Sequence, residues 1–373
     1  MAQSHPASEP HAYVRPAENG KHQFVILAWP GDAIQHYNAF EGSRAEVTDT
    51  ISAIAEAVAR FEPVKLIVEE KDLERANARF SDRNSKNLHK INVCTVSTGC
   101  PDIWMRDMAP TFTVSNNGRK LHGVDFNFNG WGGRESSESC LKLGKSLLSE
   151  LGISRITSSI VAEGGAIEVD GQGTLIASES SIINDNRNPG KTREDIEAEL
   201  SRALGIRKFI WVPGRKKLDS TDFHIDAFAR FVRPGVVLCS KPRDALVGQS
   251  KAQSEWIEAH REARQILATA TDARGRTLEI VDVLEPRIED AGEVLDVPAE
   301  EFADYRPVFS YVNFLLVDGG VILSQFGDAE ADAAALETVR RAFPEREVVP
   351  VNAYSLGMFG GGIHCVSQEV PFA

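Results

Sequence analysis

The hydrophobic residues of this chain follow a pattern that occurs five times. In each occurrence, apolar residues spaced three and four positions apart are followed by a short run of apolar and β-branched residues. The first part of the pattern is typical of an amphipathic helix and the second of a buried strand. The predicted helices cover residues 46–61, 139–151, 193–204, 254–269 and 331–343. The strands predicted after them cover residues 64–68, 156–161, 208–212, 278–283 and 347–351.

Further apolar runs lie between these helix–strand pairs, and each of them ends in small or polar residues. They cover residues 24–32, 173–180, 236–244 and 320–328, and we interpret them as additional strands. A unit that recurs along the whole chain indicates a closed or stacked repeat architecture. An α/β fold with alternating elements and no internal symmetry is the alternative, because the units are irregularly spaced.

The sequence indicates a single large domain. No segment rich in proline, glycine and serine divides the middle of the chain, so we expect one catalytic domain over residues 21–373. Residues 1–20 are polar, contain three prolines and show no periodicity. We therefore expect them to form a flexible N-terminal arm.

The charge of the chain restricts its partners. Its 373 residues include 41 Lys and Arg against 54 Asp and Glu, a formal net charge of −13. Such a chain is repelled by phosphate backbones, so we expect no nucleic acid partner and favour small cationic molecules instead. No apolar run approaches the roughly 18 residues of a membrane span, and residues 1–20 lack the apolar core of a signal peptide. We expect a cytoplasmic protein without a membrane partner.

Cysteine usage and the absence of familiar motifs argue against a bound cofactor. The cysteines are Cys94, Cys100, Cys140, Cys239 and Cys365, an odd number with no C-x-x-C pair for zinc, which suits a reducing compartment. The glycine-rich motifs of dinucleotide and nucleotide-phosphate sites are absent, as is the G-x-S-x-G motif of a nucleophilic serine. We expect neither a metal ion nor an organic cofactor.

Four loops combine glycine with titratable side chains and are candidates for a functional site. In residues 102–110, Trp104, Arg106 and Asp107 precede a predicted strand. An Arg–Asp ion pair that closes a turn is the alternative interpretation of this segment. In the second loop, Glu163 precedes two glycines, which a tight turn alone could also require.

The other two loops supply a histidine and a cysteine. His224 and Asp226 lie two positions apart, and on a strand their side chains would share one face and point into one cleft. A histidine satisfied within the core is the alternative, and a metal site would require a third ligand close by, which does not follow Asp226. Cys365 comes after three glycines, which would keep its thiol accessible, although buried and inert cysteines are also common. A thiol, a histidine and three carboxylates could together form a nucleophile, an acid–base group and a cation site.

The motifs of this chain resemble those of the agmatine deiminase and bacterial-type peptidylarginine deiminase family. The resemblance runs from residue 24 to 371 and is carried, in order, by WMRDMAP, FNFNGWGG, EGGAIEVDGQGTLI, RNPG, HID, YVNF, QFGD and GGGIHCVSQ. It implies the pentein fold, an α/β propeller of five ββαβ units around a pseudo-five-fold axis. It also implies hydrolysis of a small cationic guanidino substrate, with agmatine, N-carbamoylputrescine and ammonia as the expected substrate and products.

The resemblance implies a role for each reacting residue. Asp107 and Asp226 would hold the guanidinium, and Cys365 would be the nucleophile that forms a covalent amidino-cysteine intermediate. His224 would protonate the departing ammonia and later deprotonate water, and Glu163 would orient His224. The other four cysteines would be structural.

Four further residues are expected to contact the substrate by the same resemblance: Trp104, Arg106, Gly361 and Gly362. The chain departs from the usual family pattern at several positions. Gly362 stands in place of Asn and Phe223 in place of Gly, the N-terminal motif is reduced to AWPGDAIQHY, and the C-terminal QQ-x-P motif has Glu369 as its second residue. These departures do not define the group that is attached to the guanidine of the substrate. Peptidyl-arginine and free arginine are therefore alternatives with the same chemistry. More remote alternatives are amidino transfer to an amine, a non-enzymatic pentein that binds a partner, and a metal hydrolase built on His224. Assembly into a homo-oligomer is a further possibility.

Overall fold

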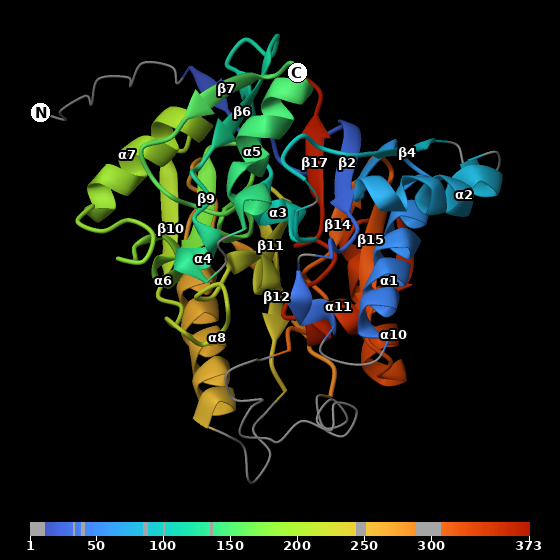
Figure 1. Cartoon of the computed structure of the whole chain (residues 1–373). Helices are drawn as coiled ribbons and strands as arrows, with labels where there is room; N and C mark the ends of the chain where they lie inside the picture. The colour runs from blue at the N-terminus through green and yellow to red at the C-terminus, as the bar shows by residue number, and fades with distance from the viewer. Residues whose placement is uncertain are drawn as a thin grey trace, which may run out of the picture.

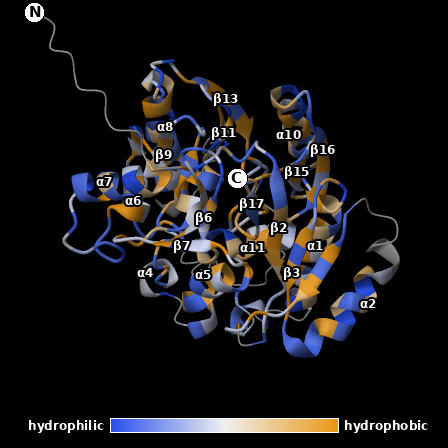
Figure 2. Cartoon of the chain, turned by 90° about the horizontal axis from the view of Figure 1, so that it is seen from above, coloured by the Kyte–Doolittle hydropathy of each residue, from blue (hydrophilic) through white to orange (hydrophobic). Residues whose placement is uncertain are grey.

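The strands of the protein form five separate sheets, which surround a common centre. The computed structural model describes residues 12–32, 34–38, 42–84, 89–99, 101–134, 137–243, 251–287 and 307–373. Within these residues three of the five sheets are formed by consecutive strands, and each of the other two also takes in a strand from a distant part of the chain. Seen from above, one long helix from each sheet's unit lies at the periphery of the molecule (Figure 2).

Every sheet contains the same three-stranded unit. A first strand pairs antiparallel with a second strand, a helix follows the second strand, and a third strand pairs parallel with the second. The first strands are β5 (Thr111–Ser115), β8 (Glu168–Val169), β11 (Ala229–Arg233), β14 (Leu315–Val317) and β17 (Gln368–Pro371). The second strands are β6 (Leu121–Asp125), β9 (Thr174–Ser178), β12 (Val236–Lys241), β15 (Gly320–Gln325) and β2 (His22–Ala28). The third strands are β7 (Ser154–Thr157), β10 (Lys208–Val212), β13 (Glu279–Leu284), β16 (Glu347–Asn352) and β3 (Val64–Ile67).

The five helices of these units confirm the repeat that the hydrophobic pattern predicts. They are α5 (Glu138–Glu150), α7 (Arg193–Leu204), α8 (Lys251–Thr269), α10 (Ala329–Ala342) and α1 (Ser43–Val58) (Figure 1). The bounds of α7 agree with the predicted ones, because Thr192 and Asp195 form a capping box at its start and Gly205 ends it at φ 72°. Helix α1 begins and ends about one turn earlier than expected. Its apolar face is buried in the core at Val47 and Ile51.

The two ends of the chain meet in one sheet. Strand β17, near the C-terminus, pairs with β2 in the register Gln368↔Ile26 and so closes the ring of units. Two short strands extend the sheets, since β1 (Tyr13–Val14) pairs with β5 and β4 (Ile91–Cys94) pairs with β3.

The expectation of a flexible arm over residues 1–20 is wrong for its second half. Residues 1–11 lie outside the described part of the chain, but Tyr13 and Val14 pair with β5, and the Arg15 and Glu18 side chains are buried. The polar composition suggested an arm, yet these two charged side chains are neutralised by ion pairs inside the molecule. The folded domain therefore begins no later than residue 13.

The remaining connections between strands contain one further helix, α2, and several short helical turns. They are η1 (Gln35–Asn38), η2 (Glu70–Asp72), α2 (Leu73–Asn84), α3 (Met105–Met108), α4 (Gly130–Gly133), η3 (Gly164–Ala166), α6 (Glu179–Ile182), η4 (Ile225–Ala227) and α11 (Tyr354–Met358). Three of them, α3, η3 and η4, come just before the first strands β5, β8 and β11 and pack against one another in chain order. No helix in the described residues is long and apolar enough to cross a membrane.

Candidate active site

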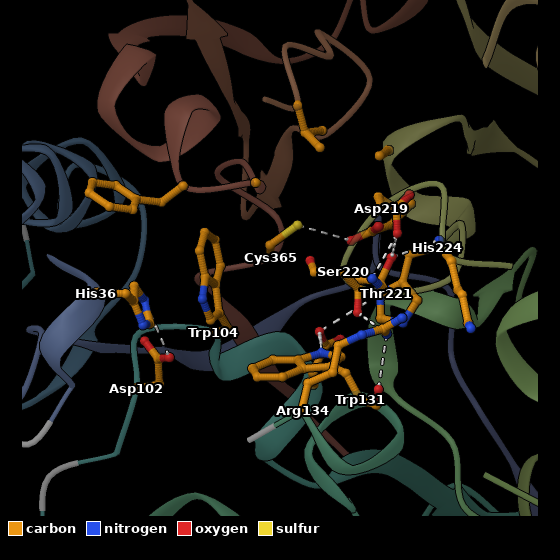
Figure 3. Close-up of a pocket in the computed structure, with 17 residues that line it drawn as sticks. His36, Asp102, Trp104, Trp131, Arg134, Asp219, Ser220, Thr221, His224 and Cys365 are labelled. Atoms are coloured by element: carbon orange, nitrogen blue, oxygen red, sulfur yellow. Dashed lines mark hydrogen bonds and ion pairs between the residues drawn. The ribbon is translucent and has the colours of Figure 1, made fainter. Parts of the chain in front are cut away.

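A cavity of about 580 Å³ opens where the segments that precede the first strands meet. Asp107 lies in α3 before β5, and Glu163 lies directly before η3 and β8. His224 and Asp226 lie at η4 before β11, and Cys365 lies in the loop before β17. Since equivalent segments of a repeat reach the same distance from its axis, residues that are far apart in sequence come together here (Figure 3).

The structure brings together the five residues expected to react. Cys365 Sγ lies 3.6 Å from Asp226 Oδ2. His224 lies between two carboxylates, with Nδ1 3.7 Å from Asp107 Oδ2 and Nε2 3.4 Å from Glu163 Oε2. Glu163 has no exposed surface and lies behind the histidine, outside the cavity wall. The other four residues line the cavity.

The local structure around His224 differs from the prediction. The sequence predicts His224 and Asp226 on a strand, but His224 lies just before a single turn of 3₁₀ helix and Asp226 lies within it, and β11 begins only at Ala229. Their alternation of two positions was therefore not a strand pattern. Both side chains still line the same cavity, because the turn and the backbone before it direct them to one side.

Each of the two guanidinium-binding candidates is held by hydrogen bonds. Asp107 accepts from Trp131 Nε1 at 2.8 Å through Oδ2 and from the Gly165 N–H at 2.9 Å through Oδ1. Asp226 accepts from His364 Nδ1 at 2.7 Å through Oδ2. Its Oδ1 is buried and has no hydrogen-bond partner among the described residues. Asp226 thus lies in the cavity wall with one carboxylate oxygen whose hydrogen-bonding capacity is unused among the described residues.

The carboxylates control the protonation of the site. Burial by itself would lower the pKa of His224, but Asp107, Glu163 and Asp226 outweigh it and raise the pKa to about 9. Burial raises the pKa of the Cys365 thiol well above its usual value, and the negative charges of Asp226 and Asp107 raise it further. Burial also raises the pKa of Asp107. The site without a cation thus holds a protonated histidine and a neutral thiol at neutral pH.

Asn313 contacts the nucleophile candidate but was not singled out in the sequence. It lies just before β14, and its Nδ2 donates to Cys365 Sγ at 3.3 Å. Its Oδ1 accepts from the backbone N–H of His364 at 3.0 Å. The YVNF motif contains this residue, so the motif marked the site without indicating a role. With Asn313, the segments before all five first strands contribute to the site.

The expected substrate contacts are divided between the cavity wall and the interior. Trp104 lines the cavity. A side chain at Gly361 would come within 2.2 Å of the Trp104 ring, and one at Gly362 within 2.4 Å of Asn313 Oδ1. The two glycines therefore make room for neighbours and are not part of the cavity wall. Arg106 is fully buried beside Glu18 and Glu369, outside the cavity wall.

Phe223 has no part in the cavity wall. Its ring is buried against Phe228, Trp256 and His260, with ring centroids 5.5 to 6.0 Å apart. Its backbone has φ 78°, a conformation that glycine adopts without strain. Phe223 in place of the family's usual glycine therefore adds backbone strain and fills the core. It does not change the lining of the cavity.

The wall of the cavity also carries other charges of both signs. The carboxylates of Asp102 and Asp219 and the cationic side chains of Arg134 and Lys217 lie among the lining residues. Arg134 is paired with Asp222 at 3.2 Å, whereas Lys217 is exposed. The sequence did not identify these two cations as site residues, because they lie in segments without a recognised motif. In the described residues, no group of three or more His, Cys, Asp and Glu side chains is arranged to hold a metal ion.

Comparisons with known proteins agree with this geometry. Residues 14–371 match the family model of the Porphyromonas-type peptidyl-arginine deiminases. The agmatine deiminase of Stutzerimonas stutzeri is 36% identical over 96% of this chain and 95% of that protein. The agmatine deiminase of Medicago truncatula is 33% identical over 97% of each chain.

The fold agrees with that of a solved relative. The structure of the Enterococcus faecalis agmatine deiminase superposes with a TM-score of 0.80, at 26% identity and over 100% of both chains. The five antiparallel–parallel units around a centre are the pentein fold. The chain belongs to the Porphyromonas-type peptidyl-arginine deiminase family.

Proposed function

We propose that the protein hydrolyses a guanidino substrate, with agmatine giving N-carbamoylputrescine and ammonia. The observation that carries this proposal is the placement of a thiol, a histidine with a pKa of about 9 and two buried carboxylates around one cavity. The curated relatives that are named agmatine deiminase support agmatine as the substrate.

The two carboxylates suit a flat cation. A guanidinium presents pairs of N–H groups in one plane, and carboxylates accept them in charge-assisted hydrogen bonds. Asp226 Oδ1 is already without a partner among the described residues, and Asp107 lines the same cavity. Binding between them would hold the guanidinium carbon in a fixed plane next to Cys365 Sγ.

Binding of the cation would also activate the nucleophile. The pKa of the Cys365 thiol is raised by burial and by Asp226 and Asp107. A guanidinium between the same two carboxylates would cancel their charge, so the thiol would lose its proton to water more readily. The thiolate would then attack the central carbon of the guanidinium.

His224 would carry the proton in both halves of the reaction. Its proton would pass to the departing nitrogen, which leaves as ammonia and leaves an S-alkylthiouronium on Cys365. The neutral imidazole would then take one proton from water, whose oxygen attacks the same carbon. As the C–S bond breaks, the remaining hydroxyl proton would pass to the departing sulfur, which releases the ureido product and restores the thiol. Glu163 would hold the ring through Nε2 at 3.4 Å.

Ammonia release from a panel of guanidines tests the proposal. The panel contains agmatine, free arginine, a blocked arginine ester, an arginine peptide and a guanidinoalkanoate, each with and without an added amine. We expect ammonia from agmatine, a carbamoyl product and no activity in Cys365→Ser. Release only from the peptide would assign a peptidyl-arginine substrate instead. Transfer of the amidino group to the added amine would contradict hydrolysis.

A further inference from the structure

Asp226 is held from behind by buried side chains that take no part in the proposed proton transfers. His364 Nδ1 lies 2.7 Å from Asp226 Oδ2, and Nε2 of the same ring lies 3.0 and 3.1 Å from the two oxygens of Glu18. The His364 side chain has no exposed surface, and that of Glu18 is 8% exposed. Neither Glu18 nor His364 is among the residues that line the cavity.

The partners of His364 fix its orientation. An ionised carboxylate can only accept hydrogen bonds, so each ring nitrogen that faces one must donate. A ring that donates from both nitrogens carries a positive charge, and it cannot turn without losing both bonds. His364 therefore transmits the position of Glu18 to the carboxylate of Asp226.

Glu18 is itself held by two buried arginines. Arg106 Nη1 lies 3.1 Å from Glu18 Oε1, and Arg230 Nη2 donates to Glu18 Oε2. Both arginines have no exposed side-chain surface. These two cations lower the pKa of Glu18 together with His364, against the effect of burial. The carboxylate is thus kept ionised and in place by residues from two other units of the ring.

We propose that Glu18 and His364 are positioning residues that fix the Asp226 carboxylate with its Oδ1 turned to the guanidinium. The inference rests on the proposed function, because that function places the guanidinium at Asp226. It gives the segment that leads into β2 a part in substrate binding, although this segment forms no part of the cavity wall. It also gives Arg106 an indirect role in place of the expected substrate contact.

The contact between His364 and Asp226 predicts that a change at His364 alters the pH dependence of kcat/KM. The charged groups around Asp226 are His364, His224, Arg230 and Arg106, which favour its ionised form, and Asp107, which opposes it. Cys365 is also in contact with it. Removing the charge of His364 raises the pKa of Asp226. The acidic limb of kcat/KM, where Asp226 is protonated, then moves to higher pH.

Two variants and one matched control test the proposal in the full-length protein. In Glu18→Gln and His364→Gln we expect KM for agmatine to rise about 10- to 100-fold, the range of one charge-assisted hydrogen bond, with a smaller change in kcat. The acidic limb of kcat/KM should move to higher pH in both. The control is Glu62→Gln, because Glu62 is also a buried carboxylate that holds a histidine, His22 at 3.1 Å, and no hydrogen bond or ion pair joins it to Asp226 in the described residues. Its KM and pH profile should stay those of the unchanged protein.

A second readout separates this proposal from the proposed function. Chloroacetamidine carries the cation that Asp226 would bind, whereas chloroacetamide is neutral and of the same size. The ratio of their rates of reaction with Cys365 should fall in Glu18→Gln and His364→Gln and remain in Glu62→Gln. This ratio can be measured even if no guanidine is hydrolysed, in which case only the proposed function fails. Thermal unfolding identifies any variant that does not fold, and Glu18→Asp, which keeps the charge, should recover part of the ratio. An unchanged ratio and pH profile in folded Glu18→Gln and His364→Gln would overturn the positioning role.

Discussion

Cys365 differs from the other described cysteines in the charges that surround it. Cys239 and Cys140 are buried, and burial raises the pKa of Cys94 and Cys239. Cys365 lies in a cavity wall together with two carboxylates, Asp226 and Asp107, which would attract a cationic electrophile to it. We expect brief treatment with chloroacetamidine to give one adduct, which intact-mass measurement detects and peptide mapping places at Cys365. Cys365→Ser should give none. An adduct at Cys94 or Cys239 would contradict the assignment of the nucleophile.

His224 makes stability depend on pH as well as activity. Its pKa is raised from 6.5 to about 9 in the folded protein. A raised pKa means that the folded state binds the proton more tightly, so the stabilisation is complete below about pH 6.5 and is lost as pH rises through about 9. The free energy of unfolding in urea should therefore fall over this window. In His224→Gln the fall over the same window should be smaller, and an equal fall in both proteins would show that the carboxylates do not stabilise the imidazolium.

At the scale of elements, the short turn η3 allows His224 and Asp107 to lie close to its backbone. A Cβ at Gly165 would lie 2.6 Å from His224 Nδ1 and 3.0 Å from Asp107 Oδ1. Gly165→Ala should therefore displace both side chains and lower kcat/KM by about 100-fold, the cost of a misplacement near 1 Å. Thermal unfolding should show a folded protein. The control is Gly144→Ala, where the nearest neighbour lies at 3.3 Å and a helix favours alanine. Equal activities of the two variants would contradict the close approach.

The sequence predicted those elements whose pattern of apolar and capping residues lies within the element itself. Each of the five helices has an apolar face that repeats at helical spacing, and α7 also has capping residues at both ends, so its bounds could be read directly. The 3₁₀ turn at η4 could not be read, because an alternation of two residues is too short to distinguish it from a strand. The order in which the sheets join was also hidden, since β17 pairs with β2 across almost the whole chain.

At the scale of the molecule, the ring assembles the site from residues that sequence spacing does not connect. The motifs located Asp107, Glu163, His224, Asp226 and Cys365 because family resemblance links residue types to chemistry. Glu18 carried no such signal, and its contact with His364 spans 346 positions. Its polar surroundings in the sequence even suggested a flexible arm. Buried charged residues of this kind are found only when the fold shows which cations neutralise them.

The charge of the whole molecule bears on the choice between agmatine and free arginine. The net charge is −13, and the cavity is lined by four carboxylates, Asp102, Asp107, Asp219 and Asp226, against three cations, Arg134, Lys217 and the protonated His224. Agmatine carries two positive charges, whereas arginine adds a carboxylate that this field repels. We expect agmatine to exceed arginine by about tenfold or more in kcat/KM at low salt, which requires about 1.4 kcal/mol.

Salt and the exposed Lys217 test this electrostatic origin. Raising the ionic strength from about 0.01 M to about 1 M shortens the screening length from about 30 Å to about 3 Å, so kcat/KM for agmatine should fall and the preference should narrow. Lys217→Ala removes a cation that the structure places at the cavity, and it should widen the preference by making arginine a poorer substrate. Sodium chloride titrations of kcat/KM for both substrates measure these effects. If arginine equalled agmatine at low salt in both proteins, an anion-binding contact other than Lys217 would have to hold its carboxylate, and the cavity would not select by charge.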